Sequence, residues 1–292
     1  MLIKFNRVKT VKKIIGIFFV VIIISLFLIG FDKNAPDEII VVSREDGSGT
    51  RGAFIELFSI EEKDKNGNRK DYTTKEAIIT SKTDVMLANI ANDKNAIGYI
   101  SLGSLNSSVK ALNIDDIKPT ENNVKNGTYK IKRYFNIATK GESTGLTKDF
   151  IDFILSKEGQ EIIAKDYISV DENFNTYSGD KPSGRIVIAG SSSVSPIMEK
   201  LKEAYLKINT NAIIEIQMTD STGGITSAID GTCDIGMSSR ELKDSEKEQL
   251  KEIQIAIDGI VVIVNNENTF SNLTKEQVKL IFTGIITRWD EM

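Results

Sequence analysis

Short apolar runs alternate with amphipathic segments along most of the chain from residue 38 onward. Runs of about 4–8 apolar residues bounded by turn formers are typical of strands, and apolar residues three and four apart are typical of helices. The alternation of the two predicts an α/β fold. The expected strands are residues 39–43, 97–101, 186–189, 213–217 and 259–265, with residues 129–139 also extended.

Four apolar stripes at helical spacing predict helices whose buried faces pack in the core. The last of these helices should begin with Thr274 and Gln277 as a capping box and end at Gly284. We expect residues 61–72 to be a charged loop and residues 176–184 to be a linker rich in turn formers. The stripes are Phe54, Leu57 and Phe58; Phe150, Phe153 and Ile154; Met198, Leu201, Tyr205 and Ile208; and Val278, Ile281 and Phe282.

The first 31 residues differ from the rest of the chain. An apolar run from Ile14 to Phe31 contains no charge and is near the minimum length for a transmembrane helix. Five basic residues precede it, which favours a cytoplasmic N-terminus and an extracytoplasmic remainder. A cleaved signal peptide is the alternative, although residues 32–34 offer no small-residue cleavage site. We therefore expect residues 1–37 to be an uncleaved anchor in the cell membrane, followed by a short linker.

Charge and composition restrict the possible functions. Because five of the 37 basic residues lie in the first 31 positions, the remainder carries 32 basic against 41 acidic residues, a net charge of −9. A duplex nucleic-acid binder shows the opposite balance, so we expect no nucleic-acid partner. The chain has no histidine, the commonest general base and metal ligand. Its single cysteine, Cys233, excludes an internal disulfide and is expected to be a buried thiol. We predict neither an enzyme nor a bound cofactor or metal.

Three loops share one chemistry, in which a strand end is followed by small hydroxyl residues or glycines and then by a helix start. Backbone N–H groups at a helix start lack intrahelical partners and carry the positive end of the helix dipole, so such turns suit oxyanions. Arg44 adds a positive charge beside the first loop, and in the second loop Ser195 is expected to cap a helix that has Pro196 in its first position. The loops are residues 43–54, 189–196 and 220–225.

The first loop also contains Gly47, Gly49 and Gly52 in the spacing G-x-G-x-x-G. A dinucleotide site requires these glycines directly after a strand and an acidic residue at the end of the next parallel strand. Here three charged residues come first and a charged loop follows, and no Gly-Lys-Ser/Thr triplet is present for a nucleotide-phosphate loop. The glycines instead favour a tight wrap around a small anion, with Thr50 starting the helix.

The chain resembles one known family over nearly everything from residue 38 to the end. The segments that carry the resemblance are AGSSSVSP, GGITSAIDGTCDIGMSSREL, DGIVVIVN, LTKEQVKLIFTGIITRW, VVSREDGSGTRGAF, NAIGYISLG and FIDFILSKEGQ. Together they closely resemble the extracytoplasmic phosphate-binding protein of the phosphate ABC importer. The resemblance implies a two-lobed, type II periplasmic-binding-protein fold that closes around inorganic phosphate and delivers it to the permease subunits of the importer.

The order of the segments differs from that of the family, in which the AGSSSVSP half comes first. The chain thus resembles a circular permutant whose ancestral termini are joined through SGDKPSG. A rearranged or truncated gene product that pairs incompletely is the rival interpretation. The permutant implies that Asp37 and Met292 lie near one another. The implied parts are lobe one at residues 140–254, lobe two at residues 38–128 and 266–292, and crossing strands at residues 129–139 and 255–265.

The resemblance also implies a phosphate shell. Arg44 would supply the formal positive charge in a fork suited to two phosphate oxygens, and Asp46 would orient Arg44. Ser239 stands where many relatives have an acidic acceptor for the phosphate proton, which implies weaker rejection of sulfate. The shell residues are Ser191, Ser192, Ser193, Ser221, Ser239, Arg44, Asp46, Ser48, Gly49 and Thr50.

Two further residues leave alternatives open. Asp220 stands where the family usually has glycine, and it would either replace the missing acceptor or repel the ligand. Arg240 would either join the site or pair with a nearby acid. Three alternatives to the importer receptor are a surface oxyanion sensor or scavenger without a transport role, a weakly binding paralogue, and a phosphoryl-transfer or nucleotide-dependent enzyme. The missing histidine argues against the enzyme.

Overall fold

The computed structural model describes residues 38–63, 69–171 and 173–292, and the chain forms two compact units. The small unit contains Glu38 and residues 288–292, where Glu38 and Arg288 form an isolated antiparallel bridge and η2 (Trp289–Glu291) is a single 3-10 turn. The predicted anchor lies outside the described residues. None of the helices in the described part of the chain combines the length and apolar character needed to cross a membrane.

The large unit, residues 39–287, is built on a nine-stranded sheet in the order β10-β9-β11-β8-β12-β5-β1-β4, with β6 also paired to β12. All the strands predicted from the sequence are present. The strands are β1 (Ile40–Arg44), β2 (Glu61–Lys63), β3 (Arg69–Asp71), β4 (Ile78–Thr80), β5 (Ala96–Ser101), β6 (Lys110–Ala111), β7 (Asn113–Ile114), β8 (Lys132–Thr139), β9 (Gly184–Ser191), β10 (Ala212–Thr219), β11 (Ile235–Ser238), β12 (Lys251–Val264) and β13 (Asn272–Leu273).

The helices include the four that the apolar stripes predict. The capping box of Thr274 and Gln277 is confirmed at the start of α10, and Gly231 ends α8 with a left-handed φ of 72°. The helices are α2 (Gly49–Leu57), α3 (Thr83–Asn92), η1 (Leu102–Ser104), α4 (Glu121–Lys125), α5 (Gly145–Ile154), α6 (Lys157–Ile163), α7 (Ser195–Ile208), α8 (Ser221–Asp230), α9 (Asp244–Lys247) and α10 (Lys275–Phe282).

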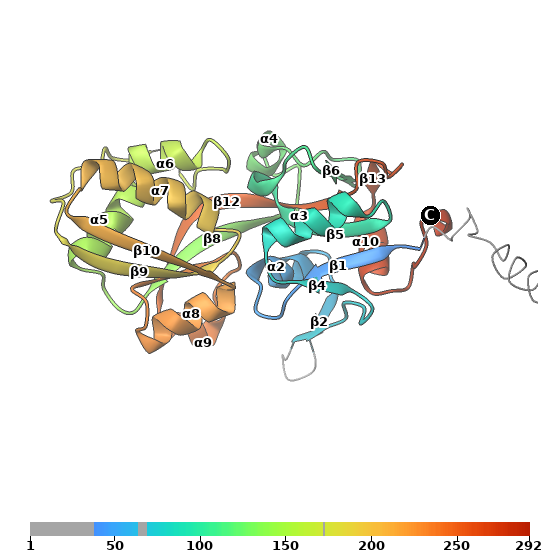
Figure 1. Cartoon of the computed structure of the whole chain (residues 1–292), viewed down its shortest axis with the longest axis horizontal. Helices are drawn as coiled ribbons and strands as arrows, with labels where there is room; N and C mark the ends of the chain where they lie inside the picture. The colour runs from blue at the N-terminus through green and yellow to red at the C-terminus, as the bar shows by residue number, and fades with distance from the viewer. Residues whose placement is uncertain (1–37, 64–68, 172) are drawn as a thin grey trace, which may run out of the picture. The chain divides into compact units, whose positions relative to one another are not determined.

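Strand β12 belongs to both halves of the large unit. Its residues 251–259 pair antiparallel with β8, and its residues 260–264 pair antiparallel with β5. Figure 1 shows β12 running from one group of elements to the other, with β8 beside it. We call the group around β9, β10 and β11 lobe one and the group around β1, β4 and β5 lobe two. The large unit therefore has the two-lobed α/β architecture that the sequence predicts.

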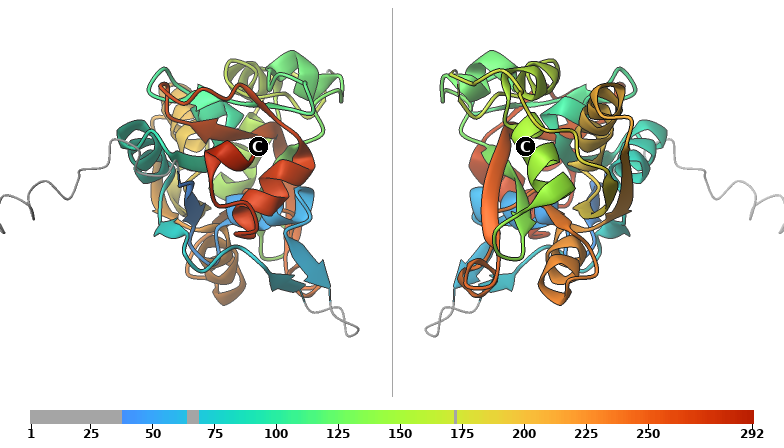
Figure 2. Two further views of the ribbon diagram at one scale, coloured as in Figure 1. Left: turned by 90° about the vertical axis from the view of Figure 1, so that its right-hand side faces the viewer. Right: turned by 90° about the vertical axis from the view of Figure 1, so that its left-hand side faces the viewer.

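In lobe one, α5, α6 and α7 cover one face of the sheet, and α8 and α9 cover the other (Figures 1 and 2). The predicted stripes of α5 and α7 belong to the first of these two cores, except that Ile208, at the end of α7, is exposed. Phe150 and Phe153 of α5 pack against Tyr205 of α7 with ring centroids 5.1 and 5.4 Å apart. The position of this core follows directly from the helical spacing of its aromatic residues.

In lobe two, an aromatic cluster supports the sheet beneath α2 and α10. Phe54 stacks on Tyr99 of β5 with ring centroids 3.8 Å apart and meets the edge of Phe282 at 4.7 Å. On the other face, Met86 and Ile90 of α3 pack into a second core. The cluster fixes α2, and with it the loop of residues 43–54, against the end of β1.

Two local expectations were wrong. The segment of residues 61–72 is not only loop, because β2 and β3 pair antiparallel within it, and backbone pairing needs no apolar side chains. The residue that caps α7 is Val194 rather than Ser195. The Ser195 hydroxyl instead donates to the carbonyl of Ser191, which leaves it inside the first turn of the helix.

The predicted linker lies outside any helix or strand until β9 begins at Gly184, and a buried carboxylate holds it in place. Asp149 of α5 accepts hydrogen bonds from the hydroxyls of Tyr177 and Tyr205, both at 2.6 Å, and from the backbone N–H of Asp180 at 3.0 Å. Asp149 is only 6% exposed. Its partners therefore join the linker to α5 and α7 of lobe one.

We expect Asp149→Ala to lower the free energy of unfolding by about 2–4 kcal/mol, because it leaves several buried donors without an acceptor. Urea unfolding measures the effect. Asp152→Ala is the matched control, since Asp152 lies three residues further along the same helix and pairs with Lys148 at the surface. Equal stability of the two variants would show that Asp149 does not hold the linker.

Candidate functional site

The three hydroxyl-lined loops converge at the junction of the two lobes, although they lie far apart in the sequence. Arg44 Nη2 donates to Ser192 Oγ at 3.0 Å, and Thr50 Oγ1 lies 2.8 Å from Ser193 Oγ. The third loop joins them through backbone, because the N–H of Thr222 donates to the carbonyl of Gly47 at 3.1 Å. The structure thus brings the loops together as the sequence predicts.

Buried serines form the part of the site that belongs to lobe one. Ser191 Oγ donates to Ser239 Oγ at 2.9 Å, and Ser239 Oγ lies 3.3 Å from Ser221 Oγ. The backbone N–H of Ser239 also donates to Ser221 Oγ at 3.0 Å. Ser191, Ser192, Ser193, Ser221 and Ser239 are all at most 5% exposed. These hydroxyls therefore lie in a dry environment, where each hydrogen bond is stronger than it is in water.

The starts of α2 and α8 face this junction. Ser48 caps α2 by accepting from the N–H of Arg51 at 3.3 Å, and Asp220 caps α8 by accepting from the N–H of Gly223 at 2.8 Å. Asp220 therefore acts as a helix cap, a role that neither of the two expectations for it described. The helix starts come very close, since a Cβ atom at Gly49 would lie 2.3 Å from Ser221 Oγ. Glycine at this position is what allows the two lobes to meet.

Arg44 is buried at the end of β1 and forms an ion pair with its neighbour Glu45. Its Nε donates to Glu45 Oε2 at 2.7 Å, and its Nη2 donates to Glu45 Oε1 at 2.8 Å. The backbone N–H of Arg44 donates to the hydroxyl of Tyr99, whose pKa burial raises to about 12, so that this group stays protonated. Glu45 thus holds the guanidinium and Tyr99 holds the backbone of Arg44, while Nη2 reaches Ser192.

The expected role of Asp46 is corrected by this geometry. The Asp46 side chain is 98% exposed and lies 3.0 Å from Arg51 Nη1, outside the hydroxyl cluster. Glu45 reaches Arg44 with both carboxylate oxygens and therefore does the orienting that was expected of Asp46. Of the two alternatives for Arg240, the structure shows the ion pair, with Nη1 and Nη2 2.8 and 2.9 Å from the Glu246 carboxylate.

Sequence reasoning missed a second buried arginine. Arg133 of β8 donates from Nη1 to Thr50 Oγ1 at 2.8 Å and to the carbonyl of Ser239 at 3.1 Å, and from Nε to Asp258 of β12 at 3.0 Å. Burial raises the pKa of Asp258 and lowers that of Arg133, and their mutual contact opposes both shifts. A signal was present for Asp258, which is the one charge between Ile253 and Val264 of β12, but Arg133 stands beside Lys132 and carries no such signal.

Other chemistry is sparse in the described part of the chain. No group of three or more histidine, cysteine, aspartate or glutamate side chains there is placed to hold a metal ion. Cys233 is buried as expected, and burial raises the pKa of its thiol to about 11, which makes it a poor nucleophile at neutral pH. The chemistry that remains is the binding of an anion by hydroxyl, N–H and guanidinium donors.

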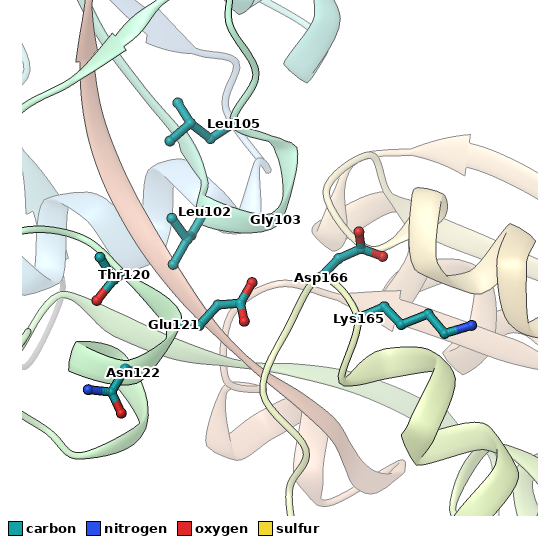
Figure 3. A pocket seen from close by; sticks show the side chains of 8 residues that line it. All are labelled: Leu102, Gly103, Leu105, Thr120, Glu121, Asn122, Lys165 and Asp166. Atoms are coloured by element: carbon teal, nitrogen blue, oxygen red, sulfur yellow. The ribbon is translucent and has the colours of Figure 1, made fainter.

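A separate hollow of about 490 Å³ is lined by residues from both lobes, including η1, α4 and the end of α6. Figure 3 shows the carboxylate of Glu121 pointing toward this space, whereas the side chains of Asp166 and Lys165 extend away from Glu121. The Glu121 carboxylate repels an anion there, and Asp166 is paired with Lys200 at 2.6 Å. The hydroxyl cluster at the ends of β1 and β9, rather than this hollow, is therefore the candidate site.

Comparison with known proteins identifies the family of the chain. The model of the PBP superfamily domain matches residues 32–158 and 175–291. The "Phosphate-binding protein PstS 2" of Streptococcus agalactiae serotype V is 55% identical over 263 residues, which is 89% of each chain. The PstS protein of Bacillus subtilis is 35% identical over 138 residues, or 46% of this chain and 43% of that relative.

Among solved structures, the crystal structure of a phosphate-binding protein of a phosphate ABC transporter from Streptococcus pneumoniae TIGR4 is similar to this chain. It matches with a TM-score of 0.71 and 44% sequence identity, over 87% of this chain and 99% of that one. The chain therefore belongs to the PBP superfamily and, within it, to the family of PstS phosphate-binding proteins.

Proposed function

We propose that this chain is the extracytoplasmic receptor that binds inorganic phosphate and supplies it to an ABC-type phosphate importer, without covalent chemistry. The observation that carries the proposal is the meeting of three hydroxyl-lined loops around one guanidinium, with Arg44 Nη2 3.0 Å from Ser192 Oγ. The streptococcal relatives are named as phosphate-binding proteins, which supports the same ligand. A buried set of donors drawn from two lobes suits a ligand that is enclosed when the lobes meet.

The proposed shell relies on dipoles more than on formal charge. Arg44 is paired with Glu45 and Arg133 with Asp258, so these four charges cancel. The charge of the anion would be balanced by hydroxyl and N–H dipoles and by the helix starts of α2 and α8. The hydroxyls bond to one another in this structure, and a bound anion would take over some of those bonds. The proposed shell is Ser191, Ser192, Ser193, Ser221, Ser239, Arg44, Ser48, Gly49 and Thr50.

The number of donors is sufficient for useful affinity. A hydrogen bond to a charged group contributes about 1.5–3 kcal/mol net. Micromolar binding requires about 8 kcal/mol, so several such bonds reach it after the cost of ordering the ligand and the lobes. Asp46 is left out of the proposed shell, because its side chain points into solvent.

We also propose that the segment order is circularly permuted relative to relatives such as the Bacillus subtilis protein, with the lobe boundaries that the resemblance implies. That relative aligns with less than half of this chain, whereas the Streptococcus agalactiae protein aligns through 89% of it. Contacts near both ends support the proposal, because the N–H of Ile39 donates to the carbonyl of Thr287 at 2.7 Å. Under this proposal, the stretch held by Asp149 joins the ancestral termini.

The proposal includes a membrane tether formed by residues 1–37. The uncharged run from Ile14 to Phe31, with basic residues before it, supports an uncleaved anchor that keeps the binding lobes outside the membrane. A receptor tethered in this way stays close to the permease subunits, which raises its effective concentration there.

We expect Arg44→Gln to weaken phosphate binding by at least about 100-fold, because it removes charge-assisted hydrogen bonds from a dry site. Isothermal titration of the full chain with inorganic phosphate measures the effect. Arg185→Gln is the matched control, since Arg185 forms an exposed ion pair with Glu215 on lobe one. A phosphate affinity of Arg44→Gln within about threefold of the wild type would refute the proposed site.

Gly49→Ala should obstruct the meeting of the lobes, because the new methyl group would lie 2.3 Å from Ser221 Oγ and 2.7 Å from Ser239 Oγ. We expect about tenfold or greater loss of phosphate affinity, with thermal unfolding in the absence of phosphate nearly unchanged. In the control Gly52→Ala, the nearest atom is Arg240 Cδ at an ordinary 3.5 Å. If both variants bind equally well, lobe contact at Gly49 plays no part in binding.

A further inference from the structure

The two crossing strands carry one buried ion pair. Arg133 and Asp258 are register partners on β8 and β12, and their side chains are 3% and 0% exposed. Burying two charges is costly, and an apolar pair of similar volume often supports a fold equally well. The stability of the strands is therefore not a sufficient reason for an ion pair at this position, and its contacts outside the strands suggest another role.

The guanidinium divides its donors between the strands and the site. Nε donates to Asp258 Oδ2 at 3.0 Å, while Nη2 lies 3.0 Å from the same oxygen without the alignment of a hydrogen bond. Nη1 points the other way and donates to Thr50 Oγ1 and to the carbonyl of Ser239. The other Asp258 oxygen accepts from Ser101 Oγ at 2.8 Å, which fixes the carboxylate. One side chain of the crossing strands thus touches the proposed shell in both lobes.

The contact with Arg133 decides where the Thr50 proton goes. A guanidinium can only donate, so Thr50 Oγ1 must accept from Arg133 Nη1. The single hydroxyl proton of Thr50 is then directed elsewhere, either to Ser193 Oγ at 2.8 Å or to a bound anion. A hydroxyl that accepts from a charged donor becomes a stronger donor itself.

We propose that Arg133, held by Asp258, is a positioning residue that makes the Thr50 hydroxyl a donor to the bound anion and ties Thr50 to Ser239 across the lobes. This inference rests on the proposed phosphate site. Arg133 acts through Thr50, so removing Arg133 weakens binding only while Thr50 has a hydroxyl to be positioned.

A double-mutant cycle on the full chain tests this dependence. The arginine is removed as the neutral pair Arg133→Met/Asp258→Asn, which leaves no unpaired buried charge and keeps an acceptor for Ser101. Affinity for inorganic phosphate is measured by titration in the wild-type and Thr50→Val backgrounds. We expect the neutral pair to lose about tenfold or more in the wild-type background and less than about twofold in the Thr50→Val background.

The conservative variant Arg133→Lys gives a second readout. A lysine keeps the charge beside Asp258, but its single ammonium group cannot reach Asp258, Thr50 and Ser239 together. We expect thermal unfolding without phosphate close to that of the wild type and phosphate affinity reduced about tenfold. Arg185→Met, which breaks an exposed ion pair of lobe one, is the control for losing an arginine and should bind phosphate as the wild type does.

Three results would overturn the inference. The first is an unchanged phosphate affinity in Arg133→Met/Asp258→Asn, and the second is an equal loss of affinity in the wild-type and Thr50→Val backgrounds. The third is that neither Arg133→Met/Asp258→Asn nor Arg133→Lys folds without phosphate, because the ion pair would then be structural. If the proposed phosphate-binding function itself is wrong, the results differ from these three. In that case the wild type takes up no phosphate, or Arg44→Gln binds as well as the wild type, whatever the Arg133 variants do.

Discussion

Direct contact between hydroxyl and guanidinium groups of opposite lobes is the constraint on which the rest of the structure depends. Ser192 and Ser193 of lobe one meet Arg44 and Thr50 of lobe two with no apolar layer between them. Polar groups buried at this depth need partners, because each unpaired one costs about 1–3 kcal/mol. The two lobes must therefore meet in one register, and Gly49 is the position where any side chain would prevent it.

Strand β12 helps to hold the two lobes in that register. One continuous strand pairs with β8 in lobe one and with β5 in lobe two, so the lobes are connected through the sheet as well as through the site. The break between these pairings falls at residues 259 and 260, directly after Asp258. The ion pair of Asp258 with Arg133 thus lies where the strand passes from one lobe to the other, and it reaches Thr50 from there.

The two lobes and the meeting of the three loops were implied by the family resemblance, whereas apolar periodicity was sufficient to predict the α/β class and the helix faces that pack in the cores. It failed where backbone pairing or side-chain direction decides the outcome. The charged β2–β3 hairpin has no apolar pattern, and Asp46 differs from Glu45 only in where the turn points its side chain. Arg133 was not predicted because it stands beside Lys132 in a basic run, and only the register of β8 with β12 places it opposite Asp258.

The proposed anion site lies in a chain whose residues 32–292 carry a net charge of −9. This is physically consistent, because surface charges more than a Debye length of about 8 Å away are largely screened at physiological salt. Inside a dry cluster, by contrast, the nearest dipoles dominate the interaction. Each arginine at the site is neutralised by a carboxylate that also fixes its orientation. Pairing with a carboxylate therefore weakens the long-range attraction of each arginine for an anion, but it fixes the direction of the arginine's donors. This suits a ligand that is recognised by the placement of donors around a tetrahedral oxyanion.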